Sequence, residues 1–260
     1  MKQWNGLLKK EWATMSGQFY LTAGASLIFS LLIPFGSSLF NWGLDALEVS
    51  LILSLVWMAT SMLIPTIMLL ISLGKEMSRP DIWLHSPASI LKLFGSKAVF
   101  AGFVGFVNMV IPTMVLIIES RFSGFPVELS FVTNLNIGGL LFVTFYMASL
   151  LIMCTGLFFG VLYQLMKPVV KGFAIPNVVI LFLFSSWLAE RISSTTAYKK
   201  ISNIGPIKGP GKGLFNIDEG NFFFQIDTTF FYMGDTLLNL LFGALLFITA
   251  VVLFEKKVRI

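Results

Sequence analysis

The sequence predicts an all-α, polytopic membrane protein with six transmembrane helices and both termini in the cytoplasm. Hydrophobic residues make up 56% of the 260-residue chain and charged residues 12%, which is about half the charged fraction of a soluble domain. Six apolar segments each approach the roughly 20 residues that a helix needs to cross a bilayer. Between these segments, lysine and arginine gather in alternate loops, as expected for a chain that crosses the membrane repeatedly.

An amphipathic helix is expected at residues 3–16, before the first span. Its apolar face carries Trp4, Leu7, Leu8, Trp12 and Met15. Lys9 and Lys10 lie on the other side, and Glu11 interrupts the apolar arc. This segment is too polar to span, and its pattern is typical of a helix that lies in the membrane interface. No short apolar core with a small-residue cleavage site begins the chain, so the first span is expected to stay in the mature protein.

The six spans form a single transmembrane domain over residues 1–260. We place them at about 19–40, 49–74, 97–118, 135–164, 172–190 and 232–254. Prolines at positions 34, 65, 112 and 176 fall inside spans and are expected to kink them. Gly156 and Gly160 form a GxxxG pattern that allows close helix packing. We favour packing within the chain over a dimer contact at this pattern.

The distribution of positive charge sets the predicted topology. One side receives Lys2, Lys9, Lys10, Lys75, Arg79, Lys92, Lys97, Lys167, Lys171, Lys256, Lys257 and Arg259. The short loops of the other side contain Arg121 and several acidic residues. Long loops weigh less in this rule, so the 191–231 loop is assigned to the outside and the 75–96 loop to the cytoplasm. The basic pI then reflects topology, and we expect no nucleic-acid partner.

The long external loop ends in the aromatic run Phe222–Tyr232. This run predicts either a strand or an interfacial helix, and the residues do not decide between the two. A phosphate-binding loop is excluded around Lys212, because Pro206 and Gly213 occupy positions where that motif requires Gly and Ser or Thr.

The sequence shows no pattern of residues that predicts catalysis or metal binding. No ionisable residue lies deep in a predicted span, which disfavours ion-coupled transport. The chain has one histidine, His85, one cysteine, Cys154, and no hydrolase motif. We therefore predict that the chain is not an enzyme by itself, and we assign no catalytic, cofactor-binding or metal-binding residue.

The 75–96 loop is longer than a simple connection requires. It contains Trp83 and a Ser86-Pro87 pair that is typical of a helix start. A short helix with an aromatic residue and mixed charges could bind a cytoplasmic partner. Alternatively, Trp83 could anchor an ordinary connector at the headgroups. The residues alone leave both interpretations open.

The opening WNGLLKKEW and the phrase DIWLHSPASILKLFGSK resemble the membrane subunits of ABC type-2 exporters. They are particularly similar to Gram-positive exporters of peptide toxins of the phenol-soluble-modulin type. The resemblance covers the whole chain in architecture and implies a permease subunit in a bacterial cell membrane. It implies a second copy or paralogue of the permease, a separate subunit that binds ATP and Mg²⁺, and no cofactor on this chain. The implied coupling residues are Arg79, Asp81, Trp83, Leu84, His85, Ile90 and Phe94.

The resemblance also implies that spans one, two and five line the transport pathway. The pathway candidates are Ser54, Trp57, Thr60, Ser61 and Thr66. An uncharged wall of this kind suits amphipathic peptides, whereas lipids, glycan precursors and drugs are alternative cargo. A non-transporting membrane sensor or assembly module that recruits a cytosolic partner is the alternative from another functional class. Membrane lipid is an expected partner of the chain.

Overall fold

The computed structural model describes the chain over a set of separate ranges. These are residues 2–33, 35–36, 46–77, 89–119, 131–208, 215–219, 222–226 and 229–258. Within them, five helical segments are long and apolar enough to cross a membrane. They are Gln3–Leu32, Ile52–Met77, Ile90–Ile118, Leu135–Ser193 and Met233–Lys256. This arrangement agrees with the predicted class of helical, multi-pass membrane protein.

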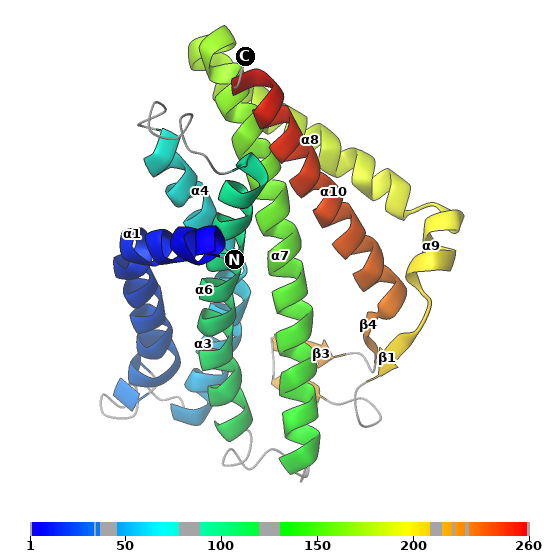
Figure 1. Cartoon of the computed structure of the whole chain (residues 1–260). Coiled ribbons are helices and arrows are strands. Elements are labelled where there is room, and N and C mark those ends of the chain that lie inside the picture. The colour runs from blue at the N-terminus through cyan, green and yellow to red at the C-terminus, as the bar shows by residue number, and fades with distance from the viewer. Residues whose placement is uncertain are drawn as a thin grey trace.

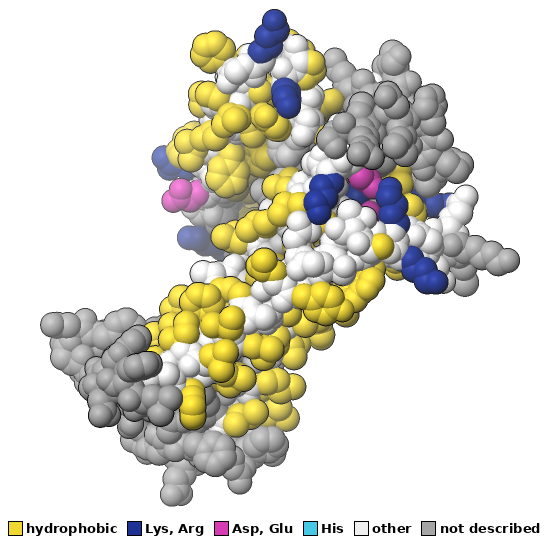
Figure 2. Space-filling view, turned by 90° about the vertical axis from the view of Figure 1, so that its left-hand side faces the viewer, with side chains coloured by type: hydrophobic (Ala, Val, Ile, Leu, Met, Phe, Trp, Pro, Cys, Tyr) yellow, Lys and Arg dark blue, Asp and Glu magenta, His cyan; other side chains and the backbone are white. Residues whose placement is uncertain are grey.

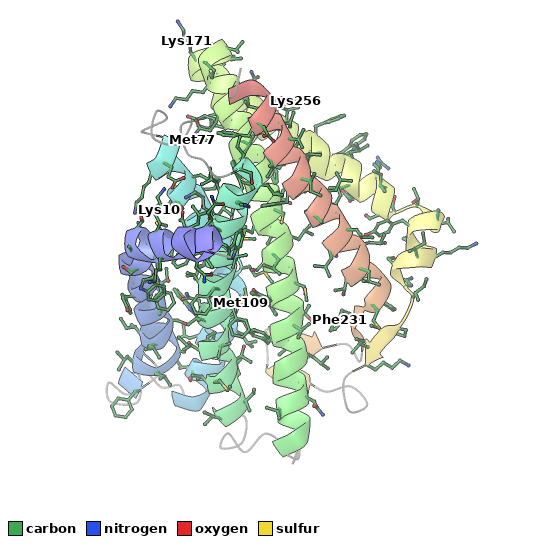
Figure 3. The ribbon with its side chains drawn as sticks, viewed as in Figure 1. Lys10, Met77, Met109, Lys171, Phe231 and Lys256 are labelled. Atoms are coloured by element: carbon green, nitrogen blue, oxygen red, sulfur yellow. The ribbon has the colours of Figure 1, made fainter. Side chains whose placement is uncertain are left out.

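The first helix combines the two N-terminal elements that the sequence predicts separately. Helix α1 spans Lys2–Leu27 without interruption, and the π-helix η1 follows at Ile28–Leu32. The part of α1 that contains Lys10 lies across the bundle, whereas the later part runs along it (Figures 1 and 3). No break separates the transverse part from the predicted first span, because helical structure continues through Gly17.

The predicted second span consists of two helices, α3 at Ala46–Ser61 and α4 at Ile64–Met77. A turn at residues 62–63 separates them. Pro65 lies in the first turn of α4, where a missing N–H costs no helical hydrogen bond. A Cβ atom on Gly105 would lie only 2.2 Å from Pro65 Cγ. The proline therefore starts a new helix and packs into a notch that glycine provides.

Three long helices follow, α6 at Ile90–Glu119, α7 at Phe131–Val170 and α8 at Ala174–Ser193. The 3-10 helix η2, Lys171–Phe173, joins α7 to α8. Lys171 has a positive φ of 49°, and α8 runs back beside the upper part of α7 after this turn (Figure 1). The candidate span Leu135–Ser193 thus contains a reversal of chain direction. Helix α6 starts at Ile90, before the start of the predicted span at residue 97.

The GxxxG pattern of α7 packs within the chain. A Cβ atom on Gly156 would lie 2.3 Å from Thr66 Cγ2, and one on Gly160 would lie 2.6 Å from Leu70 Cδ2. Thr66 and Leu70 are one helical turn apart on α4. The two glycines therefore let α4 approach the backbone of α7 closely, in agreement with the favoured intrachain interpretation.

The segment between α8 and the last helix contains both helix and strands. Its elements are α9 (Thr196–Ser202), β1 (Pro206–Lys208), β2 (Phe215–Glu219), β3 (Phe222–Ile226) and β4 (Thr229–Tyr232), and α10 (Met233–Val258) follows. Strand β1 pairs antiparallel with β4, and β2 pairs antiparallel with β3. The described part of the aromatic run thus takes the strand alternative, so the all-α class holds for the bundle and not for this segment.

One apolar core joins α1, α4, α6, α7 and α10. Phe94 of α6 contacts Phe254 of α10 edge-on, with ring centroids 5.2 Å apart. Met15, Leu69 and Leu157 are also buried in this cluster. The core fixes the beginning of α6 between α1 and the last helix, and so sets the position of the polar groups described next.

Candidate functional site

A buried group of charged and polar side chains joins α1, α4 and α6. The ammonium nitrogen of Lys97, on α6, lies 2.7 Å from Glu11 Oε1 on α1 and 3.2 Å from Glu76 Oε2 on α4. It also donates a hydrogen bond of 2.7 Å to Ser72 Oγ on α4. Ser72 in turn donates to Glu11 Oε2 at 2.6 Å. We call this group, completed by Lys10, the charged junction.

The two central charges of the junction are almost completely buried. Lys97 exposes 2% of its side chain and Glu11 exposes 4%. Isolated charges at such depth would cost several kcal/mol each, so partners are needed. Glu11 therefore interrupts the apolar arc of α1 because it meets a lysine there. Sequence reasoning noted the interruption but did not predict the ion pair, since Glu11 and Lys97 are distant in the chain.

The outer side of the junction reaches the surface. Lys10, half-exposed on α1, lies 2.5 Å from Glu76 Oε1, so the Glu76 carboxylate lies between two lysines. Figure 3 shows Lys10 on the transverse part of α1 and Met77 at the nearby end of α4. Glu11 and Glu76 both contact Lys97, and Glu76 also contacts Lys10. The junction thus balances two acidic groups with two basic ones.

Further contacts attach the transverse part of α1 to its neighbours. Lys75 Nζ on α4 lies 3.2 Å from Gln18 Oε1 and 3.4 Å from the carbonyl oxygen of Thr14. Lys92 on α6 donates to Gln3 Oε1 at 3.3 Å. These bonds connect α1 to the end of α4 and to the start of α6 along most of its transverse length.

Helices α4 and α6 border the 78–88 segment in the sequence, and the charged junction joins them. Glu76 lies in the last turn of α4, and Lys97 lies about two turns into α6. Five of the predicted coupling residues fall outside the described residues: Arg79, Asp81, Trp83, Leu84 and His85. The structure places the other two, Ile90 and Phe94, in the first turns of α6. Both are buried in the common core, where they fix the start of α6 against the bundle.

The predicted pathway residues occupy four different surroundings. Ser54 and Ser61 are completely buried within the described chain. Trp57 stacks on Phe29 of η1, with centroids 4.7 Å apart and planes 10° apart. Thr66 packs against α7. Thr60 is exposed, and its hydroxyl donates to the Trp57 carbonyl oxygen at 2.9 Å, so of the five candidates it is the one with an open surface.

A second polar feature lies inside the membrane-spanning part, and sequence reasoning missed it. Asn108 of α6 is fully buried and donates to Thr22 Oγ1 at 3.2 Å and to the Val104 carbonyl oxygen at 2.9 Å. Ser26 donates to the Asn108 carbonyl oxygen at 3.2 Å, and Ser50 donates to the Ser30 carbonyl oxygen at 3.1 Å. The serine pair at positions 26 and 30, one helical turn apart, was a usable signal for this seam.

The described residues contain no group of three or more His, Cys, Asp and Glu side chains arranged to hold a metal ion. Comparisons of the chain with models of protein families, with curated proteins and with solved structures give no match. The geometry of the charged junction and the organisation of the sequence therefore carry the functional argument.

Proposed function

We propose that the chain is the transmembrane subunit of an ATP-driven exporter, coupled to a separate ATP-binding subunit through the 75–96 loop. The supporting observation is the charged junction. It joins α1 to both helices that border the 78–88 segment, and it does so with buried ion pairs and not only with apolar contacts. A force applied to that segment would reach three helices together, as an energy-coupling element requires.

In this proposal the chain crosses the membrane six times, with both termini in the cytoplasm. The segment Leu135–Ser193 crosses twice, because α7 and α8 reverse direction at Lys171. Two such chains, or this chain and a paralogue, form the pathway in a bacterial cell membrane, and each contacts one ATPase. ATP and Mg²⁺ bind that ATPase, and this chain contributes no catalytic group.

The proposed cargo is an amphipathic peptide. The uncharged walls of the predicted spans support this class over sugars and ions, and lipids, glycan precursors and drugs share the same wall chemistry. A vesicle assay in which a labelled amphipathic peptide competes with a labelled lipid separates these cargoes. Faster ATP-dependent uptake of the lipid would overturn the peptide assignment.

The coupling proposal is tested in the loop itself. Trp83→Ala with Arg79→Gln is expected to abolish co-purification with a P-loop ATPase and to stop ATP-dependent export. Lys167→Gln removes a similar charge from the other cytoplasmic loop and should leave both unchanged. Retention of ATPase binding and of transport in the Trp83/Arg79 variant would refute the coupling role.

The second candidate function is a membrane sensor or assembly module. The charged junction also supports it, because the junction joins the two helices that border the 78–88 segment. The partner distinguishes the two functions. Co-purification of the wild-type chain with an ATPase that has a P-loop supports the exporter. Co-purification with a kinase, in the absence of any ATP-dependent export, supports the sensor.

A further inference from the structure

We infer that the transverse part of α1, with the adjacent ends of α4 and α6, binds the headgroup of an anionic phospholipid. The surface concerned carries Lys9 on α1, Lys75 on α4 and Lys92 on α6, and we call it the basic surface. This inference does not depend on transport, because it concerns only how the chain contacts the bilayer.

Aromatic side chains beside the basic surface indicate the level of the membrane interface. Trp12 lies 6.3 Å from Tyr20 and 6.1 Å from Phe100, measured between ring centroids. Trp12 is 40% exposed and Tyr20 is 64% exposed. Exposed Trp and Tyr gather where hydrocarbon meets headgroups. Their position on α1 therefore places the transverse part of this helix at headgroup depth.

The lysines of the basic surface flank the transverse part of α1. Lys9 is three residues from Trp12 on α1 itself, and Lys75 of α4 contacts Gln18. Lys92 contacts Gln3 at the other end of the transverse part. Lys9, Lys75 and Lys92 are all exposed. The phosphate of a lipid at headgroup depth would meet these ammonium groups. The acyl chains of the same lipid would lie against the aromatic side chains.

Among the described residues, the charged junction pairs the acidic side chains next to this surface with lysines. Glu11 is buried against Lys97, and Glu76, exposed to 15%, is shared between Lys97 and Lys10. Both acids are therefore neutralised within the protein. Figure 2 shows the result on the face that carries α1, where dark-blue side chains surround a small magenta patch above a broad yellow area. An approaching anion meets lysines there, and each lysine near such a surface contributes roughly 1 kcal/mol to binding anionic lipid.

The test measures how lipid stabilises the full chain in a neutral detergent. Phosphatidylglycerol and phosphatidylcholine with the same acyl chains are titrated separately, and Tm is recorded at each concentration. We expect phosphatidylglycerol to raise Tm at lower concentration than phosphatidylcholine. Inorganic phosphate at the same concentrations should produce no rise, because it lacks the acyl chains that the aromatic side chains contact.

Charge-matched variants locate the site. Lys9→Gln, Lys75→Gln and Lys92→Gln together should weaken the phosphatidylglycerol response by about tenfold or more. The control replaces Lys167, Lys171 and Lys256, which are exposed elsewhere, and Figure 3 labels Lys171 and Lys256 apart from Lys10. The control should keep the wild-type response. If the first variant does not fold, Lys9→Gln with Lys92→Gln against Lys167→Gln with Lys171→Gln gives the same comparison.

Three results would overturn the inference. Equal responses to the two lipids would show that the surface does not select anionic headgroups. Equal weakening in both variants would show a general effect of net charge. An unchanged lipid response in the first variant, together with loss of a soluble partner, would assign the surface to an acidic protein.

Discussion

Replacing Lys97 with methionine removes the only cation that contacts Glu11 among the described residues. The change keeps most of the side-chain volume, so the apolar core around Phe94 stays filled. Glu11 is then left nearly buried, and among the described residues the Ser72 hydroxyl is its remaining side-chain hydrogen-bond donor. Glu76 keeps Lys10 as a partner. The perturbation therefore concentrates on one uncompensated carboxylate between α1 and the two helices it contacts.

The expected loss of stability follows from that carboxylate. Breaking a buried ion pair by removing one partner costs roughly 3–5 kcal/mol, and the donor from Ser72 favours the lower end. For a chain of this size about 3 kcal/mol corresponds to roughly 6–12 °C in Tm. Replacing Glu11 with leucine as well removes the buried charge, so the double variant should return to within about 1 kcal/mol of wild type.

Thermal unfolding of the detergent-purified protein measures these differences. Lys92→Met is the matched control, because it makes the same substitution at an exposed position on the same helix, where about 0.5 kcal/mol or less is expected. If Lys97→Met and Lys92→Met unfold at the same temperature, the ion pair does not stabilise the junction. If the double variant is as unstable as Lys97→Met, the loss comes from packing and not from an unpaired charge.

Three other changes test separate parts of the fold, each read by thermal unfolding. Gly156→Ala places a Cβ atom 2.3 Å from an α4 side chain and should cost about 1–3 kcal/mol, whereas Gly139→Ala, which meets nothing within 4 Å, should not destabilise. Burial, and then the charge and the hydrogen bond of Asp235, raise the pKa of Tyr198. The phenol donates only while protonated, so its stabilising bond is present below its ordinary pKa and is lost as pH rises through the raised value. The difference in Tm between wild type and Tyr198→Phe should accordingly shrink above about pH 10. A difference in Tm that does not depend on pH would contradict this assignment. Lys171→Gly should stabilise by about 1 kcal/mol, since glycine adopts the positive φ of that turn without penalty, and a loss of stability would show that the lysine side chain matters more than its backbone.

The reversal between α7 and α8 was predictable from the sequence, but the exact ends of the two helices were not. The predicted spans at 135–164 and 172–190 leave a short connection around Lys171, and the structure turns there. Hydropathy could not supply the exact ends of the helices, because helical structure continues beyond the predicted ends at 164 and 190 to Val170 and Ser193. The break before Pro65 is similar, since proline marks the position but both a kink and a new helix satisfy the pattern.

The candidate site was predictable in part. The 75–96 loop stands out by length and charge, and Ile90 and Phe94 lie in the apolar register that leads into α6. Glu11 was visible as an interruption of the amphipathic pattern. The residues near it in the sequence do not indicate which side chain it pairs with. The buried Asn108 was also readable in principle as a polar residue within an apolar run, but its bonds to α1 depend on which helix lies beside it.

Composition and charge pattern by themselves determine that the chain is a helical membrane protein, because these properties follow from the transfer of each segment between water and lipid. They also mark which segments are apolar enough to cross. Only the tertiary structure decides that Glu11, Ser72, Glu76 and Lys97 meet at one point and leave the nearby lysines exposed. The physical reason is that a buried charge is tolerated only where a partner from another helix reaches it, and that partner is set by packing and not by neighbours in the chain.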